Sequence, residues 1–161
     1  MNNVITVGIS DMKVASAPNV LVTYALGSCV GICLYDSFLK IAGLAHIMLP
    51  CDNNKNAADN KYKYADICIP MMLNEMIKLG CNKGRLVAKI VGGASMFQVS
   101  GDNEIGNIGN RNVESTKNVL KSLRIPIIAE DTGSNYGRTV WFNSNTGAVE
   151  VKSYAHQIKN L

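Results

Sequence analysis

Thr23-Tyr-Ala-Leu-Gly-Ser-Cys29 is the stretch around which the rest of the chain is arranged. It leads from the apolar segment Val20–Tyr24, which has the β-branched and aliphatic composition of a strand, through a bend of small residues to a cysteine. Two further strand-like segments follow, Val30–Tyr35 and Ile41–Met48. The residues between them, Asp36-Ser-Phe-Leu-Lys40, are typical of a turn. The sequence therefore predicts a β-hairpin directly after the cysteine.

The register of this hairpin decides whether Cys29 and His46 lie close together. If Tyr35 faces Lys40 across the turn, the same register places Cys29 directly opposite His46, with their Cβ atoms about 5 Å apart on one face of the sheet. A slip of one residue would place the two side chains on opposite faces. The sequence permits this pair in one register but does not prove that register.

The composition of the chain predicts one soluble domain that spans residues 1–161. Hydrophobic residues make up 47% of the 161 residues and charged residues 17%, which suits a single domain with a sizeable core. No uncharged apolar run reaches the ~18 residues that a membrane span needs. The first residues lack the basic start and apolar core of a signal peptide. We therefore expect a cytoplasmic protein without membrane insertion.

Charge and cysteine content limit the partners and ligands. The formal net charge of +4 comes from scattered lysines, and aromatic residues make up only 6%, which argues against nucleic acid as a partner. A negatively charged protein partner stays open. The five cysteines form no CxxC pair and, in a cytoplasmic chain, disfavour a disulfide framework. With only two histidines, His46 and His156, we expect no metal site.

The order of the predicted elements favours an α+β fold. Apolar periodicity predicts helices over Tyr62–Leu79 and Ile108–Leu123. Strand composition further predicts strands at Val4–Ile9, Met12–Ala15, Arg85–Val91, Ile127–Ala129, Thr139–Phe142 and Val149–Lys152. Strands outnumber helices and often follow one another directly. We therefore expect a compact layered α/β sandwich with mixed or antiparallel sheets rather than a doubly wound sheet.

Two segments are predicted to border the bend at Cys29. Gly92-Gly-Ala-Ser-Met-Phe97 lacks the patterns of phosphate-binding loops, so we interpret it as a tight bend that lines the same pocket. Cys51–Lys61 holds no large apolar residue and is predicted to be an exposed loop, either a lid over the site or a surface loop without a role. Ser100–Asn107 and Glu130-Asp-Thr-Gly133 are predicted to be a loop and a turn.

Cys29 and His46 together suggest a nucleophile and its base. A free thiol has a pKa of ~8.5 and becomes a good nucleophile when an imidazole takes its proton. Backbone amides near Gly27 and Ser28 are candidates to bind an oxyanion beside the sulfur. Thr23, through its hydroxyl or its carbonyl, is a candidate to orient the imidazole. The alternative stays open, because cysteine is often buried and a histidine in an apolar strand is often a core residue.

The remaining candidates have structural interpretations. We expect Cys33, Cys68 and Cys81 in the core, Cys51 exposed in its polar loop, and His156 at the surface. Glu130 and Asp131 either bind a substrate amide or cap a turn.

Seven segments of the chain, in order, resemble the CheD family of chemoreceptor glutamine deamidases. They are LGSCV at 26–30, AHIMLP at 45–50, KYAD at 63–66, KIVGGASMF at 89–97, IGNRNV at 108–113, AEDTG at 129–133 and GRTVWFNSNTG at 137–147. Each is weak alone, but the series covers most of the chain and is highly specific.

The resemblance implies a function, a site and a fold. The family hydrolyses selected glutamine side chains of methyl-accepting chemotaxis receptors to glutamate, without a cofactor. Its nucleophilic cysteine corresponds to Cys29, its histidine to His46 and its threonine to Thr23. The implied fold is a layered sandwich similar to the catalytic domain of toxins that deamidate glutamine. The resemblance also implies binding to CheC, a phosphatase of the phosphorylated response regulator CheY.

The chain departs from the family pattern at one point. The family commonly has TLGLGSC, whereas this chain has Tyr24 in place of leucine and Ala25 in place of glycine. These two differences put the shape of the bend and the rate of catalysis in question.

Two other functions stay open. One is a non-catalytic module that regulates CheC or receptors by binding, and the other is a cysteine protease or small-molecule amidase, which fits the pair of residues but not the series of segments.

Overall fold

Strands β4 (Val30–Asp36) and β5 (Ile41–Ile47) form the predicted hairpin, and every residue in both is buried. Such continuous burial requires that both faces of the sheet be covered, which explains why these segments are apolar without alternation. The computed structural model describes residues 3–52, 60–96, 107–153 and 157–161. Among these residues, no helix is long and apolar enough to cross a membrane.

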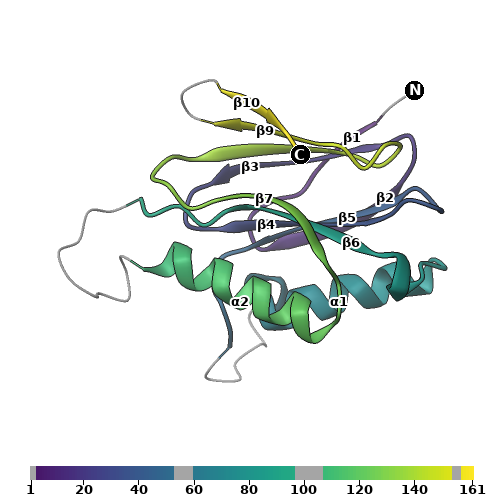
Figure 1. The fold of residues 1–161 in the computed structure, drawn as a ribbon, viewed down its shortest axis with the longest axis horizontal. Coiled ribbons are helices and arrows are strands. Elements are labelled where there is room, and N and C mark those ends of the chain that lie inside the picture. The colour runs from purple at the N-terminus through teal and green to yellow at the C-terminus, as the bar shows by residue number, and fades with distance from the viewer. Residues whose placement is uncertain (1–2, 53–59, 97–106, 154–156) are drawn as a thin grey trace.

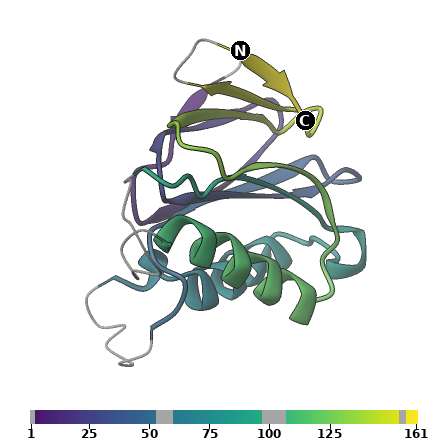
Figure 2. The same cartoon turned by 60° about the vertical axis from the view of Figure 1, so that its left-hand side comes forward.

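The hairpin is the centre of the middle layer of three (Figures 1 and 2). Sheet B has the spatial order β2 (Asp11–Ser16), β5, β4, β6 (Val87–Gly92) and β7 (Ile127–Thr132). Sheet A packs on one face of it in the order β1 (Val4–Thr6), β3 (Val20–Leu26), β8 (Arg138–Asn143), β9 (Val149–Ser153) and β10 (Ile158–Asn160). Parallel and antiparallel pairs occur in both sheets.

Two helices, α1 (Ala65–Lys78) and α2 (Ile108–Ser122), cover the other face of sheet B (Figure 1). Short 3-10 turns at Lys61–Lys63 and Lys83–Arg85 flank α1. The helices pack closely: a Cβ at Gly43 of β5 would lie 3.0 Å from side-chain atoms of Met72 and Met76. One hydrophobic cluster lies between sheet B and the helices, and a second lies between the two sheets.

This architecture confirms the predicted α+β class, with two main helices and mixed sheets.

Several element boundaries differ from those predicted from the sequence. The predicted turn at Glu130–Gly133 is wrong, because Glu130–Thr132 continue β7 in parallel pairing with β6. The strand is at the sheet edge and tolerates polar side chains there, since Asp131 pairs with Arg138 and Lys159.

Other elements are shorter, longer or unexpected. The first strand ends at Thr6, and α1 begins at Ala65 because Tyr64, between it and the preceding 3-10 turn, has an extended backbone. The sixth strand begins at Val87. Strand β10 was not predicted, since its three residues are all exposed and carry no hydrophobic pattern. Most of the loops predicted at Cys51–Lys61 and Ser100–Asn107, and His156, lie outside the described residues.

Candidate active site

The hairpin places His46 opposite Gly31, not opposite Cys29, so the predicted register is wrong by two residues. Asp36 explains the difference. Its carboxylate accepts hydrogen bonds from the backbone amides of Phe38 and Leu39 and closes the turn, so that Asp36 pairs with Ile41 as part of the strand. A slip of two residues preserves the alternation of side chains, so Cys29 and His46 still share a face.

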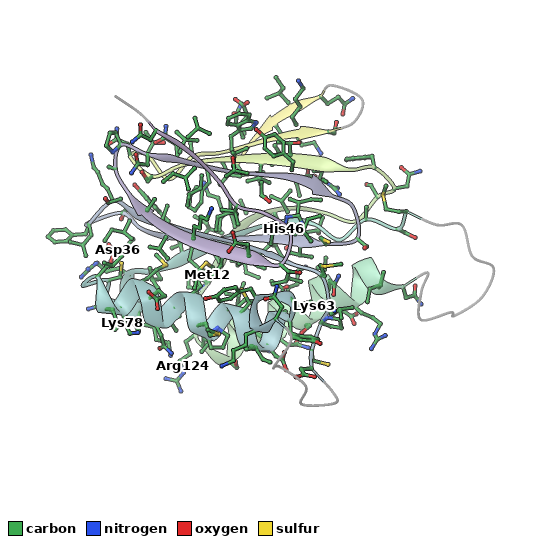
Figure 3. All side chains as sticks on the ribbon, turned by 180° about the vertical axis from the view of Figure 1, so that it is seen from behind. Met12, Asp36, His46, Lys63, Lys78 and Arg124 are labelled. Atoms are coloured by element: carbon green, nitrogen blue, oxygen red, sulfur yellow. The ribbon has the colours of Figure 1, made fainter. Side chains whose placement is uncertain are left out.

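That shared face points toward sheet A. Cys29 lies one residue before β4, is half-buried and packs against the cluster between the sheets. Its position is diagonal to His46, which for regular antiparallel strands separates the Cβ atoms by about 7 Å, within reach of an imidazole. Gly31 leaves space beside His46, since a Cβ there would lie 3.1 Å from Leu26 and 3.8 Å from the Thr23 methyl group. Figure 3 shows His46 in the layer between the two sheets.

Thr23 fixes the tautomer of His46. The Thr23 hydroxyl donates to the carbonyl oxygen of Val7 at 2.8 Å and lies 2.7 Å from His46 Nδ1. A hydroxyl has one proton and a carbonyl can only accept, so the short contact to the imidazole requires Nδ1–H to donate to Thr23 Oγ1. Neutral His46 therefore carries its lone pair on Nε2, which is buried and has no hydrogen-bond partner among the described residues. This arrangement provides an oriented base on the face shared with Cys29.

Burial keeps both groups neutral at rest. It lowers the pKa of the fully buried His46 to about 4. Burial also raises the pKa of the Cys29 thiol, against a smaller opposite effect of the residue's own backbone amide. A raised thiol pKa and a lowered imidazole pKa favour a neutral thiol and a neutral imidazole over a preformed ion pair of the two.

The backbone amides of the bend before Cys29 differ in their hydrogen bonds. The Gly27 N–H donates to the carbonyl of Ala25 at 3.1 Å, so it is not available to a ligand. Among the described residues, the amides of Ser28 and Cys29 donate to no backbone carbonyl, and the Cys29 amide interacts with its own thiol. They remain as candidate oxyanion donors. The bend begins at Ala25 with φ +60°, a left-handed conformation in which glycine is less strained.

The glycine-rich segment after β6 lies against this bend, as expected. The amide of Gly93 donates to the Cys29 carbonyl and that of Ala94 to the Gly27 carbonyl, both at 2.8 Å. Gly92 has φ +113°, and a Cβ there would collide with the carbonyl of Cys29. The segment thus holds the bend in place through backbone contacts that a side chain would prevent.

The other predicted residues lie away from this site or are structural. Cys33, Cys68 and Cys81 are buried, as expected, whereas Cys51 is half-buried rather than exposed. Glu130 and Asp131 form ion pairs in β7. No group of three or more potential metal-ligating side chains occurs in the part of the chain that the structure describes. The sequence reasoning missed one functional candidate, the buried Asn112 of α2. The pattern that could have revealed it is a polar amide side chain next to the apolar stripe of that helix.

The acid stability of the fold is expected to depend on His46. Its pKa is lower in the folded chain than the usual ~6.5, so the unfolded chain binds the proton more readily and stability falls as pH drops below 6.5. Between pH 7 and pH 5 the free energy of unfolding should fall by about 2 kcal/mol from this group. Urea unfolding at both pH values measures it. His46→Gln should remove most of this difference, and an equal difference in both proteins would contradict the assignment.

Comparison with known proteins adds independent findings. The sequence model of a family described as CheD chemotactic sensory transduction matches residues 48–153. A Caldanaerobacter subterraneus protein named "Probable chemoreceptor glutamine deamidase CheD" is 51% identical over 99% of both chains. A Clostridium novyi protein of that name is 51% identical over 98% of this chain and 97% of its own. A Geobacter metallireducens protein named "Probable chemoreceptor glutamine deamidase CheD 2" is 46% identical over the full length of both.

A solved structure shares the fold. The Bacillus licheniformis hypothetical protein YfiH superposes with a TM-score of 0.50 over 76% of this chain, at 15% identity. The match spans half the length of that protein. At this identity the likeness supports the layered architecture alone.

Proposed function

Because this chain belongs to the CheD family, we propose that it is a chemoreceptor glutamine deamidase that uses Cys29 as nucleophile and His46 as base. Its substrates would be selected glutamine side chains on the cytoplasmic part of methyl-accepting chemotaxis receptors. One observation supports the mechanism: Thr23 orients His46 with an Nε2 that has no partner among the described residues, on the strand face that His46 shares with the half-buried Cys29.

The first half-reaction would transfer the glutamyl group to sulfur. His46 Nε2 takes the thiol proton as Sγ bonds to the Cδ carbon of glutamine. The negative charge that forms on the amide oxygen is stabilised by the N–H groups of Ser28 and Cys29. The imidazolium then returns its proton to the leaving nitrogen, the C–N bond breaks, and ammonia departs from a thioester.

The second half-reaction would release glutamate by the same groups. Nε2 takes a proton from water as the water oxygen attacks the thioester carbon, and the proton passes to the leaving sulfur. The Nδ1–H bond to Thr23 persists in both the neutral and the protonated imidazole, so the ring keeps its orientation throughout. No step requires a metal ion or an organic cofactor.

The experiment that tests this proposal is peptide mass spectrometry of a receptor cytoplasmic fragment after incubation with the protein. Conversion of specific glutamines to glutamates, with release of ammonia and an intact peptide chain, is the expected result. Cleaved peptide bonds would instead support a protease. An unmodified fragment that nevertheless binds the protein would support the non-catalytic module.

Thr23→Val tests the orientation of the imidazole. Valine keeps the branched shape but cannot accept the Nδ1–H bond, so the buried ring loses the contact that selects its tautomer. We expect the rate of deamidation to fall about 10- to 100-fold. Thr23→Ser retains the hydroxyl and is the matched control. The interpretation fails if valine and serine variants have equal rates at equal folded fraction.

Binding to a CheC-type phosphatase is a further part of the proposal, supported by the family resemblance alone. A Cys29→Ala variant separates it from catalysis, since this change removes the sulfur without altering the backbone. The variant should bind CheC as the wild type does while releasing no ammonia. If binding and catalysis are lost together in a folded variant, the two roles are not separable in this way.

A further inference from the structure

Asn112 of α2 is fully buried beneath the bend that carries Cys29. Its side-chain Nδ2 donates to the carbonyl oxygen of Ser28 and to that of Met48, each at 2.9 Å. Both neighbours are carbonyls, which only accept, so the amide nitrogen must be the atom that faces them. Its two protons are both used, while Oδ1 has no partner among the described residues. The hydrogen bonds of this side chain therefore serve only to join these two segments.

These bonds begin where the pairing of the strands ends. The ladder between β4 and β5 stops at Val30 and Ile47. Beyond it, the Cys29 carbonyl accepts from Gly93 and the Met48 amide donates to the carbonyl of Lys63, so these two groups bond to other segments rather than to each other. Asn112 then links the residue before the nucleophile to the residue two positions after His46.

We propose that Asn112 is a positioning residue that sets the separation of the Cys29 thiol and His46 Nε2. This inference rests on the proposed function. The side chain bonds to backbone on both sides of the reacting pair and to neither reacting atom. Its loss would leave the carbonyls of Ser28 and Met48 without this shared donor and allow the bend to move relative to β5. A displacement of about 1 Å at a reacting pair costs on the order of 10²-fold in rate.

The test compares Asn112→Ser with Thr116→Ala. Serine is too short to meet both carbonyls. Thr116 is also buried on α2, one turn later, and its hydroxyl has no partner among the described residues, so its loss perturbs packing without freeing either carbonyl. For Asn112→Ser we expect kcat on the receptor fragment to fall about 10- to 100-fold with KM unchanged. Thr116→Ala should retain the wild-type kcat.

A second readout needs no receptor. Alkylation of Cys29 by iodoacetamide, followed by peptide mass spectrometry, should be slower in Asn112→Ser than in the wild type and unchanged in Thr116→Ala, because a displaced bend would hold the thiol out of reach of His46 Nε2. If the wild type modifies no glutamine, the proposed function fails while alkylation still tests the positioning role.

Urea unfolding controls for stability. Should Asn112→Ser not fold at the assay temperature, Asn112→Asp offers similar volume without the two donors, and the same results are expected of it. An unchanged kcat and alkylation rate in a folded variant would overturn the proposal. So would an increase in KM alone, or an equal loss of rate in Thr116→Ala.

Discussion

Cys29→Ser is expected to lower the rate of glutamine deamidation by about 10³-fold or more. A serine hydroxyl fits the same half-buried position but is far less acidic than a thiol, and His46, whose pKa burial lowers to about 4, is a weak base for it. The thioester route is lost, while the backbone of the bend, which Gly93 and Ala94 hold through its carbonyls, is unaffected. Initial rates of ammonia release with a receptor fragment measure the effect.

Cys51→Ser is the matched control for this substitution. Cys51 is also half-buried, but it lies outside the cluster between the sheets, so it offers a thiol of similar exposure that does not belong to the site. The control should retain the wild-type rate. A Cys29→Ser protein that is folded and still converts glutamine at the wild-type rate would rule out the proposed nucleophile, and a loss in Cys51→Ser alone would point to a different cysteine.

His46→Gln is expected to reduce the rate by a similar factor, about 10³-fold. Glutamine can reach Thr23 with its amide but cannot take the thiol proton, and the raised pKa of Cys29 leaves little thiolate at neutral pH without that base. If proton transfer is the lost step, raising the pH should restore part of the rate by ionising the thiol directly.

The pH profile therefore distinguishes a lost base from a lost structure. We expect the rate of His46→Gln to rise with pH, whereas the wild-type rate should be nearly level between about pH 5 and 8, above the pKa of His46 at about 4. His156→Gln, which changes the other histidine of the chain, is the control and should match the wild type. A folded His46→Gln variant with a flat profile and an unchanged rate would contradict the assignment.

The central part of this fold could be predicted from sequence because its apolar segments have few alternatives. β4 and β5 are buried on both faces, so their composition alone identified them and the turn between them. The register could not be derived, because it depends on how the Asp36 carboxylate closes the turn through the amides of Phe38 and Leu39. The exposed β10 has no hydrophobic pattern to detect.

The residues of the candidate site were predictable as types but not as an arrangement. A cysteine after a bend and a histidine in the next strand suggested a pair, and a threonine nearby suggested an orienting group. The sequence could not show that Thr23 donates to Val7 and must therefore accept from His46, because only the fold brings Val7, 16 residues earlier, next to Thr23. Asn112 was equally hidden, since its partners are backbone atoms of two other segments.

The neutral resting state of Cys29 has a consequence for oxidative damage. Peroxides attack thiolates, and the products beyond sulfenic acid are not readily reversed. A cysteine whose pKa is raised by burial exposes almost no thiolate to the solvent between catalytic events. We therefore expect this protein to survive oxidant exposure that would inactivate an enzyme with a permanently ionised cysteine, at the expense of forming its nucleophile anew in every turnover.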